Sequence, residues 1–270
     1  MPVRRHLSAL SALLVSCALL PDGEAATPGI VGYLAPGSVP EGRELLPAPP
    51  AAGSSAEALD RAIFFATREL KGTPRWELAT RDAVYSPPAF LEHFACSLGA
   101  RPEVAQVPAL LRVVTRLEAD VGTLVNSVKA QYKRPRPFVG TDAPICGSTD
   151  REATARNWSY PSGHATMAWA TGLLLTELAP DTTARVLARA RDLGESRLVC
   201  GVHALSDVEA GRTLASALVA LLHASAEFKT DLEAARRELA TARKAPVPAT
   251  EGARCAVERD VPRAPWPMRP

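Results

Sequence analysis

The stretch that decides the fold reads "WSYPSGHATMAWATGLLLTEL", from Trp158 to Leu178. A proline, a serine, a glycine and a histidine stand in a row immediately before a run of small and apolar residues. Pro161 suits the start of a helix, where its missing N–H costs nothing, and Gly163 lets the backbone approach a ligand closely. In the first turn of a helix the main-chain N–H groups are free and the dipole favours an anion. The stretch therefore predicts an apolar helix over residues 162–178 whose N-terminus can bind an anion.

Helical periodicity continues on both sides of this stretch. Apolar residues recur at spacings of three and four from Leu110 to Val128, which predicts a long one-sided helix ending near Tyr132. The following segment has too many prolines and turn residues for a helix and is predicted to be a loop. Further helices are predicted over residues 54–70, 75–84, 88–98, 181–199 and 206–222. Because no internal repeat and no alternating strand pattern is present, the predicted fold class is all-α.

Capping signals mark three of the predicted helix starts. Ser54 with Glu57 and Ser206 with Glu209 match the capping-box pattern, and Asp181 is a candidate N-cap. The polar stretch "EFKTDLEAARRELATARK" is interpreted as a prolongation of the helix that begins at Ser206.

The length of 270 residues suits one sizeable core and favours a single domain. Proline and glycine crowd the region before residue 54, which predicts an extended segment, and prolines return after Lys244, which predicts a poorly ordered tail that Cys255 can tether. The predicted parts are a signal peptide at 1–25, an extended Pro/Gly-rich segment at 26–53, a helical domain at 54–243 and a Pro-rich C-terminal tail at 244–270.

The N-terminus predicts export. Arg4 and Arg5 precede an apolar run that ends at Leu20, and small residues follow, with cleavage expected near Ala25. The run is shorter than the roughly 20 apolar residues that a membrane span needs. We therefore expect a periplasmic protein without a transmembrane helix in its mature form. The sequence "LVSC" leaves a less favoured alternative, in which Cys17 is lipidated and anchors the protein.

Four cysteines remain after the predicted signal peptide: Cys96, Cys146, Cys200 and Cys255. An even number in an exported chain favours disulfides over metal ligation, and no C-x-x-C pair is present. Four cysteines allow three pairings, and the pattern alone does not choose among them.

Charge excludes one class of partner. The chain has 31 basic and 29 acidic residues and a formal net charge of +2, too little to predict a nucleic-acid surface. Any specificity for anions must therefore be local.

Three clusters of polar residues fall at the ends of the predicted helices: Lys129 with Arg136, "PSGH" at 161–164, and "SRLVCGVHALSD" at 196–207. Taken singly, each has an ordinary explanation as a solvated charge, an N-cap or a structural histidine. Together they contain what phosphoryl transfer requires. Lys129, Arg136 and Arg197 can neutralise the non-bridging oxygens of a phosphate ester, and Ser162 with the amides after it can donate to the same group.

The two histidines of these clusters can divide the chemistry. Asp207 follows His203 by four residues, a spacing that brings a carboxylate to one ring nitrogen and leaves the other free to attack phosphorus. His203 is therefore the predicted nucleophile. His164 has no carboxylate close in sequence, so it is the predicted acid that protonates the leaving group.

The ordered set K-x6-RP, PSGH and SR-x5-H-x3-D resembles the signature of the phosphatidic acid phosphatase type 2 superfamily. The neighbouring "NWSYPSGH" and "LGESRLVCGVHALSDVEAGR" are most similar to the soluble bacterial class A nonspecific acid phosphatases, so the resemblance covers about residues 30–240. It implies a compact all-α domain of the kind shared with vanadium haloperoxidases, and broad hydrolysis of small-molecule phosphate monoesters without metal or cofactor.

The resemblance also assigns roles to residues. It implies that His203 forms a phosphohistidine, that Asp207 orients His203, and that His164 is the general acid. It implies a bridge between Cys146 and Cys200. Members of the family often form dimers or larger oligomers, so a homo-oligomer is one option for this chain. The residues that the resemblance assigns to the phosphate are Lys129, Arg136, Ser162, Gly163 and Arg197.

The sequence leaves alternatives open. The same pocket can hold vanadate in a vanadium-dependent haloperoxidase, although such chains are usually much longer. A non-catalytic periplasmic phosphate-binding protein would need the cations but would leave His164, His203 and Asp207 unexplained. An integral lipid phosphatase is disfavoured because charges interrupt the later helices. Pro135 departs from the family pattern inside the first motif.

Overall fold

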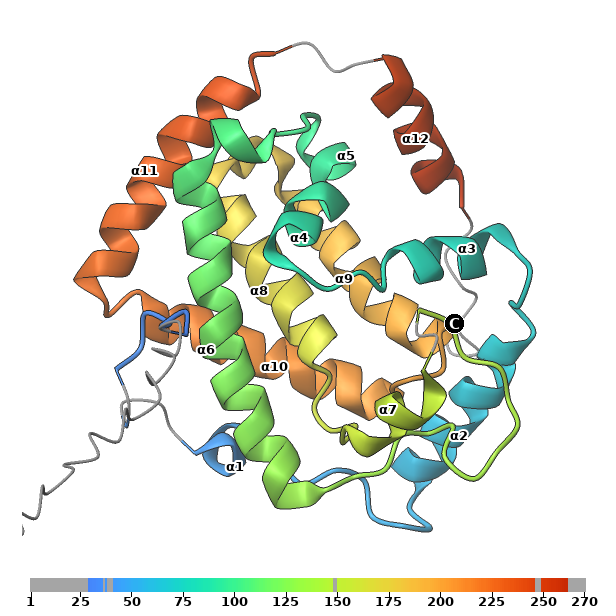
Figure 1. Cartoon of the computed structure of the whole chain (residues 1–270). Helices are drawn as coiled ribbons and strands as arrows, with labels where there is room; N and C mark the ends of the chain where they lie inside the picture. The colour runs from blue at the N-terminus through green and yellow to red at the C-terminus, as the bar shows by residue number, and fades with distance from the viewer. Residues whose placement is uncertain (1–28, 36, 38–40, 148–149, 246–248, 262–270) are drawn as a thin grey trace, which may run out of the picture.

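Helix α8 (Gly163–Leu178) lies in the middle of the computed structural model, with α6 (Pro108–Tyr132), α9 (Thr183–Val199) and α10 (Leu205–Leu222) around it (Figure 1). Small residues allow this close packing. A Cβ atom on Gly172 would lie only 2.7 Å from the Cβ of Ala190, which is too close for two carbon atoms. The close packing of α8 against α9 therefore requires glycine at this position. The apolar run quoted above is thus the helix against which the other long helices pack.

The structure describes residues 29–35, 37, 41–147, 150–245 and 249–261; the predicted signal peptide and Cys17 lie outside them. All regular elements of these described ranges are helical, which confirms the all-α prediction. The remaining α-helices are α1 (Gly42–Leu45), α2 (Ser55–Arg68), α3 (Pro74–Arg81), α4 (Pro87–His93), α5 (Ala95–Leu98), α7 (Arg151–Arg156), α11 (Ala226–Ala242) and α12 (Ala249–Asp260), with short 3-10 turns at Val104–Gln106 and Pro180–Thr182.

The apolar stripe of α6 is buried as its spacing predicts. Leu110, Leu117 and Leu124 are each at most 1% exposed and belong to the main hydrophobic core. Burying a side chain of this size contributes about 1.5–3 kcal/mol, and truncating Leu117 to alanine would cost about 2–5 kcal/mol because a cavity would remain. The stripe therefore fixes the rotation of α6 and with it the direction of Lys129 at its end.

Two predicted caps are wrong. Ser206 lies inside α10, which begins at Leu205 after Ala204, and the carboxylate of Asp207 accepts from the N–H of Ala204 at 2.8 Å. Asp181 does not cap α9; its carboxylate instead pairs with Arg243. In both places the side chain hydrogen-bonds to a residue distant in sequence instead of capping the helix: Ser206 bonds to Asp60, and Asp181 bonds to Arg243. The cap at Ser54 is confirmed, since its hydroxyl accepts from the N–H of Glu57.

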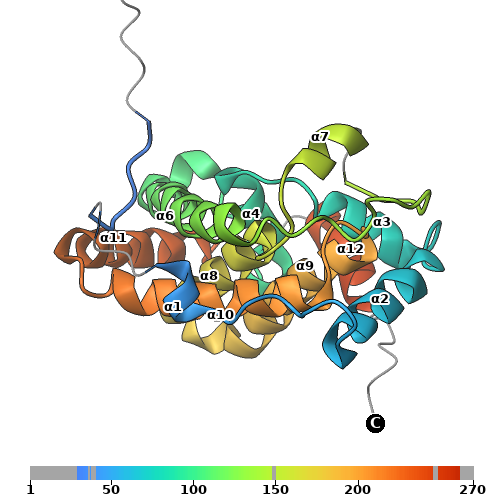
Figure 2. The ribbon, with the colours of Figure 1, turned by 90° about the horizontal axis from the view of Figure 1, so that it is seen from below.

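The last part of the chain also differs from expectation. The stretch interpreted as a prolongation of α10 is a separate helix, α11, because the chain turns after Leu222 and Ser225 caps a new start. Residues 249–260, expected to lack regular structure, form α12. Figure 2 shows α12 at the same end of the molecule as α2 and α3, whereas α1 and α11 lie at the opposite end.

Two disulfides join the four cysteines. The bridge between Cys146 and Cys200 confirms the pairing that the resemblance implied, and the second bridge joins Cys96 to Cys255. The first fixes the loop after α6 to the end of α9, and the second fixes α12 to α5. Across the ranges that the structure describes, no helix combines the length and the apolar character that a bilayer span requires.

Candidate active site

The three predicted clusters meet around one cavity of about 470 Å³. Its walls come from the C-terminal end of α6, the loop that follows it, the first turn of α8, the C-terminal end of α9 and the turn before α10. The sequence-predicted residues that line it are Lys129, Arg136, Gly163, His164, Arg197 and His203. Segments more than 70 residues apart in sequence thus contribute to a single site.

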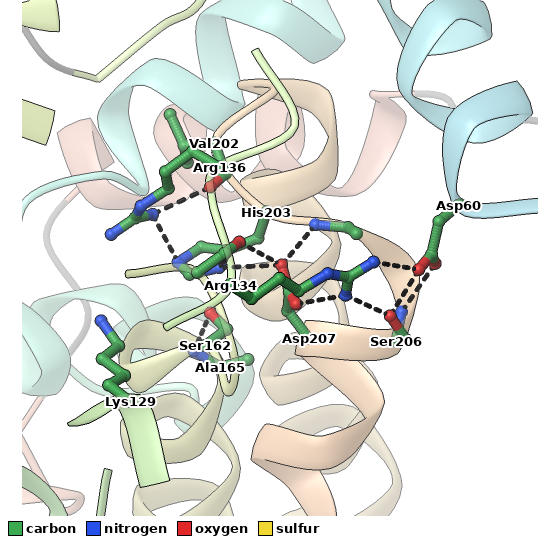
Figure 3. A network of polar contacts seen from close by, with 12 residues as sticks. Asp60, Lys129, Arg134, Arg136, Ser162, Ala165, Val202, His203, Ser206 and Asp207 are labelled. Atoms are coloured by element: carbon green, nitrogen blue, oxygen red, sulfur yellow. Dashed lines mark hydrogen bonds and ion pairs between the residues drawn. The ribbon is translucent and has the colours of Figure 1, made fainter. Parts of the chain in front are cut away.

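The two ring nitrogens of His203 have different neighbours: Nε2 lies toward Arg136, which also lines the cavity, and Nδ1 lies toward Asp207. Its Nδ1 lies 3.4 Å from a carboxylate oxygen of Asp207, and its Nε2 lies 2.8 Å from Nη1 of Arg136 (Figure 3). A proton on Nδ1 leaves the lone pair of Nε2 on the cavity side. Burial, followed by the charge of Arg136, holds the pKa of His203 well below its usual range, which favours the neutral ring.

Asp207 is completely buried and fully hydrogen-bonded. One carboxylate oxygen accepts from Arg134 at 2.7 Å, and the other accepts from the hydroxyl of Ser159 and from the N–H of Ala204. Burial alone would raise the pKa of this carboxyl, but His203, Arg134 and Ser159 outweigh it and lower the pKa to about 2. Asp207 therefore remains ionised and holds the tautomer of His203.

Arg134 extends this arrangement beyond the motif residues. Its guanidinium joins Asp207 to Asp60 of α2, at 2.7 and 2.8 Å, and Asp60 also accepts from the main chain and hydroxyl of Ser206 (Figure 3). Sequence reasoning missed Arg134, Asp60 and Ser159. The charge of Arg134 was visible inside the first motif, but nothing local indicates a partner on α2.

Three cations surround the cavity with few anions to balance them. Lys129 donates to Oδ1 of Asn157 at 2.7 Å, and Nε of Arg136 donates to the main-chain oxygen of the same residue at 2.8 Å. Burial, followed by the charge of Arg136, lowers the pKa of Lys129 to about 8. Burial lowers the pKa of Arg136 and of Arg197 to about 10. Burial and mutual repulsion thus disfavour this much positive charge, and an anion bound among the three cations would raise each pKa.

Two residues that line this cavity, Arg197 and His164, carry buried polar atoms without a hydrogen-bond partner. The atoms are Nε and Nη1 of Arg197 and Nε2 of His164. A buried donor left unpaired costs about 1–3 kcal/mol, and more when it is charged. A ligand is one way to satisfy such atoms, so the donors of Arg197 are candidates for contact with an anion.

His164 lies among aromatic rings. Its imidazole is 5.4 Å from the ring of Tyr85 and 5.2 Å from that of Phe90, measured between ring centroids. Burial, followed by the charge of Arg197, holds the pKa of His164 well below its usual range. A phosphate group bound beside the ring would favour the protonated form.

The start of α8 supplies main-chain donors. The first helical bond runs from the N–H of Thr166 to the carbonyl of Ser162 at 2.9 Å, so the amides of Gly163 and His164 precede it. The hydroxyl of Ser162 accepts from the N–H of Ala165 at 3.3 Å, and Ser162 is buried behind the cavity wall formed by Gly163. The structure thus brings the amide end of α8 to the cavity and uses the oxygen of Ser162 as the N-cap.

Residues outside the motifs complete the cavity wall. Tyr85, Glu118 and Asn126 also line it, and sequence reasoning missed them because nothing in their local pattern distinguishes them from surface positions. Among the residues that the structure describes, no group of three or more His, Cys, Asp or Glu side chains is placed to hold a metal ion.

Comparison with known proteins places this arrangement in a family. The PAP2 superfamily model matches residues 111–231. An acid phosphatase from Zymomonas mobilis is 44% identical over 195 residues, 72% of this chain and 74% of that protein. A non-specific acid phosphatase from Providencia stuartii is 34% identical over 231 residues, 85% of this chain and 93% of that protein. Among solved structures, a transmembrane PAP2 type phosphatidylglycerolphosphate phosphatase from Bacillus subtilis aligns with 64% of this chain and 87% of its own, at 21% identity and a TM-score of 0.45. This chain belongs to the PAP2 superfamily and, within it, to the bacterial class A non-specific acid phosphatases.

Proposed function

We propose that this protein is an acid phosphatase that hydrolyses a broad range of phosphate monoesters through a phosphohistidine at His203, without a metal ion. The observation that carries the proposal is a single cavity lined by both histidines, His164 and His203, and by the three cations Lys129, Arg136 and Arg197. The names of the relatives, acid phosphatase and non-specific acid phosphatase, support the same reaction.

In the proposed complex the phosphate lies against Arg197, Lys129 and Arg136, with the amides of Gly163 and His164 as further donors. Nε2 of His203 attacks phosphorus and forms a P–N bond. The P–O bond to the alcohol breaks, and its electron pair stays on the leaving oxygen, which takes the proton from Nε2 of His164.

The second half of the reaction regenerates the protein. Neutral His164 accepts a proton from water, whose oxygen attacks phosphorus as the P–N bond breaks. Inorganic phosphate leaves and the electron pair returns to Nε2 of His203. Asp207 stabilises the positive charge that develops on His203 in the first step, because its carboxylate is already ionised and oriented.

Two supporting features concern specificity and location. Every cationic contact proposed above is to the phosphate and none is to the alcohol, which supports broad specificity. The two disulfides support a periplasmic location, since such bridges persist in oxidising compartments.

The proposal is tested by hydrolysis of 4-nitrophenyl phosphate in excess EDTA between about pH 4 and pH 8, where a histidine nucleophile and acid operate. We expect turnover in EDTA and, after rapid acid-free quenching with a ³²P-labelled ester, label on His203. A folded protein without turnover at any pH in this range would refute the enzyme. Halide oxidation that appears only with added vanadate would instead favour the haloperoxidase alternative, and phosphate binding without turnover would favour the binding protein.

A further inference from the structure

We propose that Asp82 is a positioning residue for His164, and that Ser196 and Arg189 of α9 hold Asp82 in place for this task. The inference rests on the proposed function, because it concerns the acid of that reaction. It gives a role to Ser196, the serine of the third motif, which the proposed chemistry does not use.

Asp82 ends α3 and is 1% exposed. Its carboxylate accepts from both terminal nitrogens of Arg189, at 3.1 and 2.5 Å, and from the hydroxyl of Ser196 at 2.6 Å. Nη1 of Arg75 donates to the same hydroxyl at 3.0 Å. Figure 1 shows α3 beside the C-terminal part of α9, where these partners lie. A fork of two charge-assisted bonds fixes both the position and the rotation of the carboxylate.

The chain after Asp82 continues this arrangement to His164. Ala83 and Tyr85, which follow Asp82 closely in the chain, line the same cavity as His164. The ring of Tyr85, three residues after Asp82, packs against the imidazole. One short segment therefore determines the lateral position of the acid.

The same segment is held from the other side. A Cβ atom on Gly147 would lie 2.1 Å from the Cβ of Ala83, so the loop that carries Cys146 contacts the backbone next to Asp82 closely. His93 lies on the far side, where its Nε2 contacts the carbonyl of Val84 at 3.1 Å. The carboxylate of Asp82 is thus the polar anchor of a segment that is otherwise held by packing.

A positioning role differs measurably from a merely structural one. A structural role would lower activity equally for all esters through the amount of folded protein. A misplaced acid slows only those esters whose leaving group needs a proton, and general acid catalysis contributes about 10²–10⁴-fold to such reactions. For partial misplacement we expect about a tenfold loss of kcat/KM for alkyl esters and less than about threefold for 4-nitrophenyl phosphate.

The experiment measures kcat/KM for a series of aryl and alkyl phosphates whose leaving groups differ in pKa. Ser196→Ala is the main variant, because it leaves the pair of Arg189 with Asp82 intact. Asp82→Asn is the second. Asp181→Asn is the matched control, since Asp181 is also held by both terminal nitrogens of an arginine, at 2.8 and 2.6 Å from Arg243, but on the surface. The inhibition constant for inorganic phosphate is measured alongside.

We expect Ser196→Ala to steepen the dependence of kcat/KM on the leaving-group pKa while phosphate inhibition changes by less than about twofold, and Asp181→Asn to leave both unchanged. Parallel losses across the whole series in Ser196→Ala would overturn the positioning role and leave the proposed function standing. A wild-type protein that is folded and binds phosphate but cleaves no ester would overturn the proposed function itself.

Discussion

The two histidines of the cavity have opposite surroundings. His203 is held by charge, because the ionised carboxylate of Asp207 faces one nitrogen and the guanidinium of Arg136 the other. His164 is held by the aromatic rings of Tyr85 and Phe90. A nucleophile must keep one tautomer and develop positive charge, which a fixed carboxylate favours. An acid must gain its proton when substrate arrives and lose it afterwards, which surroundings without a hydrogen-bonded carboxylate allow.

The largest effect is expected from replacing His203, the histidine held by charged neighbours. His203→Ala removes the atom that forms the P–N bond, so we expect a loss of kcat of about 10⁴-fold or more and no labelled phosphoenzyme. Rapid-quench labelling with a ³²P ester checks the result. Retention of the label on the variant would assign the nucleophile to another residue, with His164 as the first to examine.

The next largest effect is expected from replacing His164, the histidine that lies among aromatic rings. His164→Ala removes the acid and keeps the phosphate contacts, so we expect losses of about 10²–10⁴-fold for alkyl phosphates and much smaller ones for 4-nitrophenyl phosphate. Steady-state kinetics with both esters, and phosphate inhibition as a control for binding, measure the difference. Equal losses on good and poor leaving groups would speak against His164 as the acid.

A smaller effect is expected from replacing Arg134, which contacts Asp207 and not His203 itself. Arg134→Gln leaves Asp207 and Asp60 without their shared cation, so His203 should lose orientation, with a fall in kcat/KM of about tenfold to a hundredfold. Breaking such a buried pair should also cost about 3–5 kcal/mol of stability. Denaturant unfolding and kinetics are measured together.

The matched control is Arg112→Gln, which breaks the more exposed contact with Asp231. Pairs at the surface contribute about 0–1 kcal/mol, so stability and kinetics should change little. If Arg134→Gln behaved like this control, Asp207 would hold His203 without help from Arg134.

The smallest effect concerns pH. Burial and nearby cations lower the pKa of His164 in the free protein, so its protonated fraction falls as pH rises, and kcat/KM should fall about tenfold per pH unit on the alkaline side. Because the pKa of Lys129 is about 8, this side chain also loses its charge when the pH rises above that value, and we expect phosphate binding to weaken. Asp207, with a pKa of about 2, stays ionised throughout and contributes no limb. A pH profile of kcat/KM checks this, and a rate still rising above about pH 9 would contradict it.

Periodicity predicted the long helices because their buried stripes are local patterns. The stripe of α6 and the apolar run of α8 lie where the spacing placed them. The errors arise where a distant partner decides. Ser206 is inside α10 because Asp60 takes its hydroxyl, and α12 lies where the bridge from Cys255 to Cys96 places it.

The candidate site divides in the same way. Six residues of the motifs line the cavity, since a motif records the groups that contact the ligand. Arg134 and Asp82 were not predicted, because each acts through a partner more than 70 residues away in sequence and a single sequence holds no record of such pairs.

The unpaired donors of Arg197 couple catalysis to folding. A ligand that binds the folded chain alone stabilises it, by about 2.7 kcal/mol at a hundred times its dissociation constant. Inorganic phosphate, the product, satisfies these donors as well as the substrate does. Under the proposed function, phosphate that occupies this cavity both blocks substrate and stabilises the folded chain, so we expect inhibition and resistance to unfolding to rise together with phosphate concentration.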